Sequence, residues 1–127
     1  MLPEKSEIES FLIEFKQKLR TFSIVYHRSE KNSQTLLDLD INDCIRNNLL
    51  LKLSVEDYYK GPTADNYDPF STPVWEFGLK KKGKDIYIKI SLGAINKPVI
   101  CKSFHIAERK IVCPYKQKST NSKDKSE

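Results

Sequence analysis

Apolar and polar residues alternate most regularly between Ile86 and Leu92. A period of two residues is the signature of a half-buried strand, with alternate side chains on opposite faces. One face carries aliphatic side chains for a core, from Ile86, Ile88, Ile90 and Leu92. The other face is open to water or a ligand and carries Tyr87, Lys89 and Ser91. A functional site is therefore expected on the open face.

Two more strands are predicted beside this one. Residues 74–79 form the first, and the basic sequence from Lys81 to Lys84, which contains Gly83, reads as the hairpin loop that follows it. Residues 99–105 are rich in β-branched and aromatic side chains and form the third. The three strands predict an antiparallel meander, whose apolar face must be covered by helices.

The clearest helix spans residues 6–22, where apolar side chains recur at helical spacing on one stripe. Ser6 and Glu9 have the spacing of a capping box at its start. A second helix is predicted over residues 43–53, with Asn42 as its N-cap. The two helices are expected to pack on one face of the sheet. Their buried stripes are expected to be Ile8, Phe11, Leu12, Phe15, Leu19 and Phe22, then Ile45, Leu49 and Leu53.

The segment between the helices has weaker signals. Residues 23–27 predict a short strand and residues 29–33 a polar turn, while the pattern of residues 35–41 fits either a strand or the approach to a helix. Ser54 is a candidate cap for a single helical turn over residues 55–59. Lys60, Gly61 and Pro62 are expected to end that turn.

Two further segments complete the expected chain path. Residues 61–73 predict a long polar loop that places Lys60 at one end of the sheet, and loops of this length are often functional. After a turn, residues 111–115 predict a short edge strand. Residues 1–115 are thus expected to form one domain, and residues 116–127 a disordered lysine-rich tail.

Length and composition favour one small soluble domain. The 127 residues are 39% hydrophobic, which is sufficient for a single core. Without a run of 18 apolar residues or the pattern of a signal peptide, we expect a cytoplasmic protein and no membrane partner. The odd number of cysteines, Cys44, Cys101 and Cys113, indicates neither a disulfide framework nor a structural zinc site.

Charge is distributed unevenly along the chain. Residues 1–78 carry 9 Lys and Arg against 13 Asp and Glu, or −4, whereas residues 79–127 carry 13 against 4, or +9. A basic surface around a sheet suits a polyanion such as RNA. A solvated basic surface with a charged tail explains the same distribution.

Metal and thiol chemistry are poorly supported by the pattern. Cys101, His105 and Cys113 lack a fourth ligand for a zinc site. Cys101 and His105 would be separated by about 13 Å along a strand, too far for a nucleophile and its base. No metal and no cofactor are expected.

An ordered set of segments resembles the MqsR family of bacterial toxins, within the RelE-like superfamily of mRNA interferases. The segments are E56-D-Y-Y-K60, V74-W-E76, D85-I-Y-I-K-I90 and V99-I-C-K-S-F104, followed by His105 to Glu108 in the pattern S-F-H-x-A-E. The resemblance covers residues 41–115. It implies an α+β fold, with N-terminal helices packed on a twisted antiparallel sheet. It also implies metal-independent cleavage of mRNA and neutralisation by a cognate antitoxin.

The same resemblance assigns site residues. The family's catalytic lysine falls on Lys60 and its strand tyrosine on Tyr87, and both match in type. A glutamine of the family falls on Glu76 and a basic residue on His105, so these two positions differ. A carboxylate and an imidazole can transfer protons in ways that the family's residues cannot.

Metal-free RNA cleavage needs a base for the 2′-hydroxyl, cations for the phosphate and an acid for the leaving oxygen. Glu76 and His105 are candidates for acid and base, in either order. Lys60 and Lys89 are candidates for phosphate binding, and Tyr87 for stacking a base or positioning a phosphate oxygen. Further RNA contacts are expected from the basic residues Lys81, Lys82, Lys84, Lys102 and Arg109.

Three classes of function fit the sequence. The first is an endoribonuclease toxin that acts on mRNA, with or without the ribosome. The second is a nucleic-acid-binding domain that uses the basic sheet without catalysis. The third is a toxin-like fold that inhibits a protein target.

Overall fold

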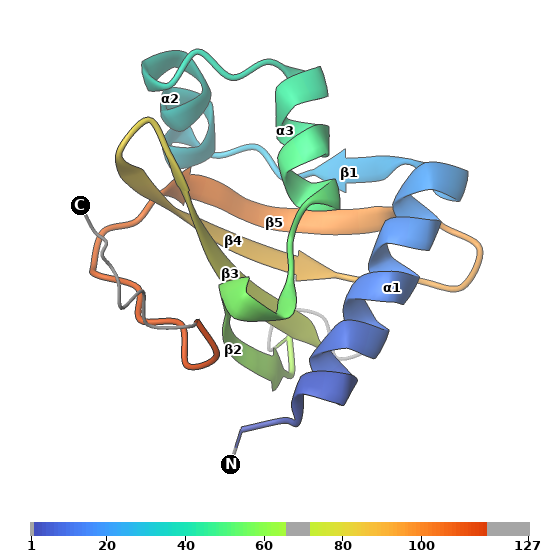
Figure 1. The fold of residues 1–127 in the computed structure, drawn as a ribbon. Helices are drawn as coiled ribbons and strands as arrows, with labels where there is room; N and C mark the ends of the chain where they lie inside the picture. The colour runs from blue at the N-terminus through green and yellow to red at the C-terminus, as the bar shows by residue number, and fades with distance from the viewer. Residues whose placement is uncertain (1, 66–71, 117–127) are drawn as a thin grey trace.

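A computed structural model describes residues 2–65 and 72–116, and in these ranges the chain has an α+β fold (Figure 1). Three helices and a 3-10 turn accompany the five strands of one mixed sheet. The helical elements are α1 (Lys5–Phe22), α2 (Glu30–Asp38), α3 (Asp43–Leu51) and η1 (Val55–Asp57). The strands are β1 (Ile24–Tyr26), β2 (Tyr58–Thr63), β3 (Val74–Lys81), β4 (Lys84–Ser91) and β5 (Val99–Ile106).

The strands lie in the order β1-β5-β4-β3-β2. Strands β3, β4 and β5 form the predicted antiparallel meander, and β2 extends it antiparallel to β3. The expectation of a wholly antiparallel sheet is wrong at the other edge, because β1 pairs with β5 in parallel. Helix α1 crosses the sheet and delivers the chain to the end where β5 starts, so Ile24 lies opposite Val99 and both strands run the same way.

The hairpin between β3 and β4 is tight. Lys81 pairs with Lys84, which leaves Lys82 and Gly83 as the two turn residues, with φ angles of 53° and 79°. Positive φ at both central positions defines the turn whose twist matches that of the flanking strands, and glycine favours it. The predicted hairpin is confirmed.

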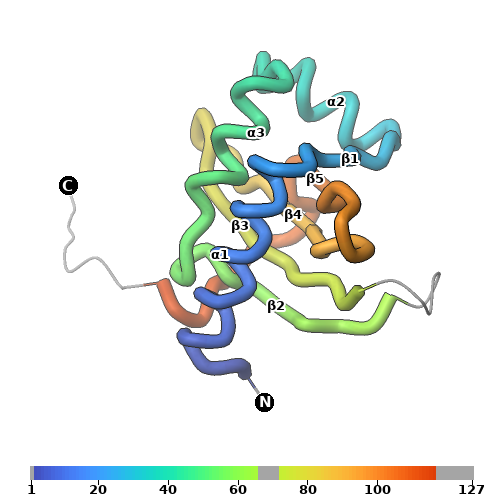
Figure 2. The backbone as a smooth tube through the Cα atoms, turned by 90° about the vertical axis from the view of Figure 1, so that its right-hand side faces the viewer, coloured from blue at the N-terminus to red at the C-terminus, as the bar shows by residue number. Residues whose placement is uncertain are grey.

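The core lies between the sheet and the helices α1 and α3, which occupy one side of it (Figure 2). Ile86, Ile88 and Ile90 are fully buried, so the predicted face of β4 is confirmed. Ser91, expected on the open face, is also fully buried. The Gly93 N–H donates to Thr72 Oγ1, so the segments flanking β3 and β4 meet at this end of the sheet, next to the paired residues Val74 and Ser91.

Helix boundaries and faces differ from the sequence pattern in detail. In α1 the capping box uses Glu4 and Glu7 rather than Ser6 and Glu9, and Phe22 is 37% exposed. Asn42 caps α3 as predicted, by accepting the Ile45 N–H. The helix turns Arg46 and Leu50 inward, while Ile45 and Leu49 are only half-buried. Leu53 is buried beyond the end of α3, and Ser54 caps η1.

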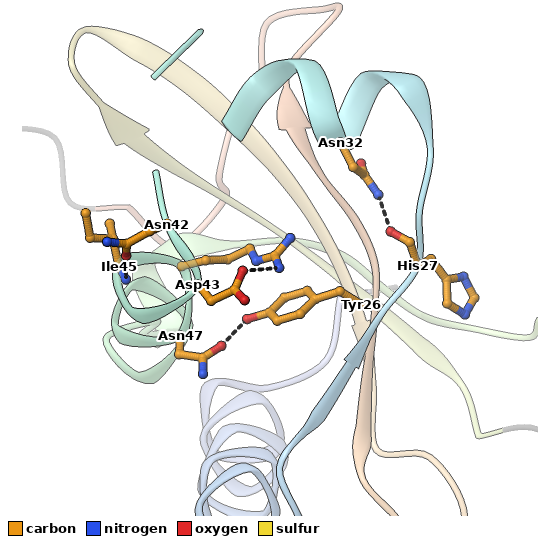
Figure 3. A network of polar contacts seen from close by, with 8 residues as sticks. Tyr26, His27, Asn32, Asn42, Asp43, Ile45 and Asn47 are labelled. Carbon is orange, nitrogen blue, oxygen red and sulfur yellow. Dashed lines mark hydrogen bonds and ion pairs between the residues drawn. The ribbon is translucent and has the colours of Figure 1, made fainter. Parts of the chain in front are cut away.

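Residues 29–33 are not a turn but the start of α2, because Ser29 Oγ accepts the Asn32 N–H and caps a helix there. This helix escaped prediction because its buried residues are polar. Asn32 Nδ2 donates to the His27 carbonyl, as Figure 3 shows, and Asn32 Oδ1 accepts the Phe104 N–H. Thr35 Oγ1 accepts the Ile106 N–H. These side chains hydrogen-bond to backbone groups of β5 in the part of that strand with which β1 does not pair.

The predicted loop and the predicted edge strand both differ from the structure. The first residues of the loop predicted over residues 61–73 belong to β2, which ends at Thr63 and in which Lys60 pairs with Glu76. Residues 66–71 of that loop lie outside the described ranges. Residues 111–115 form no strand; Ile111 instead packs on Gly78, where a Cβ would come within 2.9 Å of its side chain. Of the expected tail, residues 117–127 are also outside the described ranges.

Among the described residues, no helix is long and apolar enough to cross a membrane.

Replacing Asn32 with alanine should lower the free energy of unfolding by roughly 2–3 kcal/mol, because buried backbone groups of β5 and His27 lose their partner. Denaturant unfolding followed by circular dichroism measures the change. Gln34→Ala, on the exposed side of the same helix, is the matched control and should change stability by less than about 0.5 kcal/mol. Equal losses in the two variants would show that Asn32 contributes only helix propensity.

Candidate active site

A cavity of about 320 Å³ lies on the open face of the sheet and is called the first pocket. It is lined by the four residues assigned to catalysis from the sequence, Lys60, Glu76, Tyr87 and His105. Arg109, assigned to RNA binding, lines it as well. Its remaining lining residues are Tyr59, Ala107, Glu108 and Ile111.

Strand register brings the four residues together. Lys60 of β2 lies opposite Glu76 of β3, and Tyr87 of β4 lies opposite His105 of β5. Tyr87 also pairs with Gly78, two residues along β3 from Glu76. Each side chain is on the face opposite to the buried isoleucines, so four adjacent strands contribute to one surface.

Glu76 and Tyr87 are joined across β3 and β4. The Tyr87 hydroxyl donates to Glu76 Oε1 at 2.6 Å. Burial raises the pKa of Tyr87 above its usual value, and the neighbouring Glu76 carboxylate raises that pKa further. The phenol therefore stays protonated near neutral pH and acts as a hydrogen-bond donor rather than a base.

His105 is oriented by its own strand. Its Nδ1 lies 3.0 Å from the Ile106 carbonyl oxygen, which can only accept, so Nδ1 carries the proton of that hydrogen bond. The other ring nitrogen, Nε2, then holds the lone pair in the neutral ring and a second N–H in the cation. The ring lies beside Tyr87, with centroids 5.4 Å apart.

The cations at the pocket have different surroundings. Lys60 Nζ lies 5.0 Å from the centre of the Tyr59 ring, within the range of a cation–π contact. Sequence reasoning missed Tyr59, which lines the pocket because the register shifts between Tyr58 and Lys60. The two aromatic residues before Lys60 were the available signal. Glu108 forms an exposed ion pair with Lys31 at 2.7 Å, and this ion pair lowers the pKa of Glu108.

Lys89 does not join the other four residues. It lines an adjoining cavity of about 500 Å³, called the second pocket, with His27, Asp65, Glu76, Lys102 and Ser103 among its other lining residues. Glu76 lines both pockets, so they are contiguous on the open face. We expected one concave surface shared by Lys60, Glu76, Tyr87, Lys89 and His105. The structure instead divides these residues between two adjacent pockets.

The remaining predicted RNA-binding residues separate into two groups. Lys102 lines the second pocket, where its ammonium group pairs with Asp65. Lys81, Lys82 and Lys84 line neither pocket, because they sit at the turn beyond the paired positions of Glu76 and Tyr87.

The cysteines are not placed for shared chemistry with His105. Cys101 is 1% exposed and faces the core, whereas His105 lies on the open face of the same strand. Burial raises the pKa of the Cys101 thiol to about 12. Within residues 2–65 and 72–116, no three His, Cys, Asp or Glu side chains are grouped so that they could hold a metal ion.

Comparison with protein-family models, curated proteins and solved structures finds no match for this chain.

The raised pKa of Tyr87 predicts a pH-dependent contribution to stability. Tyrosine in an unfolded chain ionises near pH 10, before Tyr87 in the folded protein, so its contribution is complete below about pH 10 and declines above it. Tyr87→Phe removes this ionisation. Denaturant unfolding at several pH values from about 8 to 11 should show a steeper alkaline loss for the parent protein than for the variant. Parallel losses would contradict the raised pKa.

Proposed function

We propose that the protein is a metal-independent endoribonuclease that cleaves single-stranded mRNA. The observation that carries this proposal is the convergence of Lys60, Glu76, Tyr87 and His105 on the first pocket. A carboxylate, an imidazole and a cation are the groups that metal-free cleavage of a ribose phosphate requires. The net charge of +9 in residues 79–127 suits a polyanionic substrate.

The hydrogen bond between Glu76 and Tyr87 favours one division of roles. Glu76 accepts this bond at Oε1, and we assign it as the general base that removes the 2′-hydroxyl proton. The 2′-oxygen attacks phosphorus and forms a 2′,3′-cyclic phosphate. The cationic ring of His105 donates its Nε2 proton to the departing 5′-oxygen. Lys60 stabilises the phosphate charge, and Tyr87 keeps the carboxylate in place.

A toxin role is part of the proposal and is supported by the segments that resemble the MqsR family. On this reading, expression of the protein would arrest growth through loss of mRNA, and a cognate antitoxin would neutralise it. Cleavage assays with and without ribosomes distinguish a free ribonuclease from one that needs the ribosome.

Purified protein should cleave single-stranded RNA in the presence of EDTA and leave a 2′,3′-cyclic phosphate, because the proposed acid and base are side chains. Gel analysis of a labelled RNA, with mass spectrometry of the products, tests this. Binding should weaken as salt increases. Cleavage that EDTA abolishes and Mg²⁺ restores would refute the mechanism. Absence of cleavage with and without ribosomes would favour RNA binding alone or a protein target.

Glu76→Gln and His105→Gln should each lower the cleavage rate by about a hundredfold or more, because each removes one proton transfer. Lys60→Ala should lower it through lost phosphate stabilisation. Lys52→Ala, an exposed lysine after α3, is the matched control and should retain parental activity. Near-parental activity of His105→Gln would show that His105 is not the acid and would indicate a structural role for it.

A further inference from the structure

The second pocket holds charged groups that the proposed cleavage does not use. Its wall includes the ion pair of Asp65 and Lys102, whose side chains are only 7% and 17% exposed. A carboxylate and an ammonium group held together in a pocket wall present an acceptor beside a donor. Lys89 lies in the same pocket, and no salt bridge involves it among the described residues.

The pocket owes its composition to an irregularity in β5. Lys89 pairs with Ser103 and Ile90 with Cys101, so Lys102 is an extra residue in β5 at this point. A bulge of this kind interrupts strict alternation. Lys102 and Ser103 consequently both line the second pocket, while Cys101 and Phe104 on either side remain buried in the core.

The position of the second pocket relative to the first suits a strand of RNA. Tyr87 in the first pocket and Lys89 in the second are two residues apart on β4, or about 7 Å. Neighbouring phosphates of an extended single strand are separated by a similar distance. A strand with its reacting phosphate at Lys60 and His105 would therefore place the adjacent nucleotide over Lys89.

We propose that the second pocket binds the nucleotide next to the cleaved bond, and that it prefers a base with an exocyclic amino group to uracil. This inference rests on the proposed RNA substrate. Lys89 holds the phosphate of that nucleotide. Asp65 accepts a hydrogen bond from the amino group, and Lys102 donates to the adjoining ring acceptor. The single N–H on the pairing edge of uracil lies between two carbonyl oxygens, which repel an approaching carboxylate.

Cytosine and uracil make the sharpest comparison, since on this edge cytosine has an amino group and a ring acceptor where uracil has a carbonyl and a ring N–H. In the background of His105→Gln, which is expected to slow cleavage during measurement, fluorescence anisotropy gives the affinities of oligocytidylate and oligouridylate of equal length. Oligocytidylate should bind at least about fivefold more tightly. Asp65→Asn should reduce this ratio to near one, because an amide can donate to the uracil carbonyl.

Lys89→Ala provides a second, independent measurement. It should weaken both oligonucleotides by the same factor and lower the salt dependence of binding by about one phosphate contact. Lys52→Ala removes the same charge from an exposed site outside both pockets and should leave the affinities and their ratio unchanged. The ratio in the His105→Gln background and the effect of Lys89→Ala decide the question even if Asp65→Asn does not fold.

The outcomes separate this inference from the proposed function. Equal affinities for the two oligonucleotides would overturn the second pocket as a base-reading site. A ratio that Asp65→Asn leaves unchanged in a folded protein would do the same. Neither result would contradict cleavage of RNA by the parent protein. Absence of binding to either oligonucleotide would overturn the base-reading site too. The expected ratio in a protein that cleaves no RNA would support the second pocket and refute the endoribonuclease.

Discussion

The structure depends on hydrogen bonds to the backbone groups along the outer edge of β5. Strand β1 covers only the first three residues of β5, which would leave the rest of that edge without backbone partners. Asn32 and Thr35 of α2 replace a neighbouring strand by bonding to the main chain of Phe104 and Ile106. His105 lies between these two anchored residues, so a structural helix with polar buried residues fixes the position of a candidate catalytic group.

A second polar arrangement holds α3 beside β1. The Tyr26 hydroxyl donates to Asn47 Oδ1, as Figure 3 shows, and the Arg46 guanidinium lies 3.3 Å from the centre of the Tyr26 ring. Arg46 also pairs with Asp43 at 3.0 Å. The cation is thus stabilised by a carboxylate and an aromatic face although its residue is buried. Helices α2 and α3 are therefore both attached to this edge of the sheet by polar groups.

Much of the meander could be predicted because its residues obey a single period. Ile86, Ile88 and Ile90 alternate with Tyr87 and Lys89, and a buried face fixes such a register strongly. The first helix followed from its aromatic and aliphatic stripe for the same reason. Helix α2 could not be found by this reasoning, since Asn32 and Thr35 satisfy distant backbone groups that no local pattern reveals.

The candidate site was predictable only in part, for related reasons. Lys60, Glu76, Tyr87 and His105 lie on alternating or paired positions, so a sheet places them together once its strand order is known. Tyr59 and Lys102 break alternation at register shifts, and strict periodicity assigns such residues to the wrong face or leaves them unplaced. Irregular pairing depends on neighbouring strands, and this information is absent from the segment itself.

The two-residue turn at Lys82 and Gly83 has a consequence for how this protein can vary. Because β3 and β4 are paired without a shift from Val74 to Lys84, one residue inserted within β4 would turn part of the isoleucine row outward and carry Tyr87 into the core. One residue inserted within β3 would likewise exchange the faces of Glu76 and the buried Phe77. Substitutions on the open face leave that row untouched. Lineages of this fold would thus be expected to change their chemistry by replacing side chains, while the lengths of β3 and β4 stay constant.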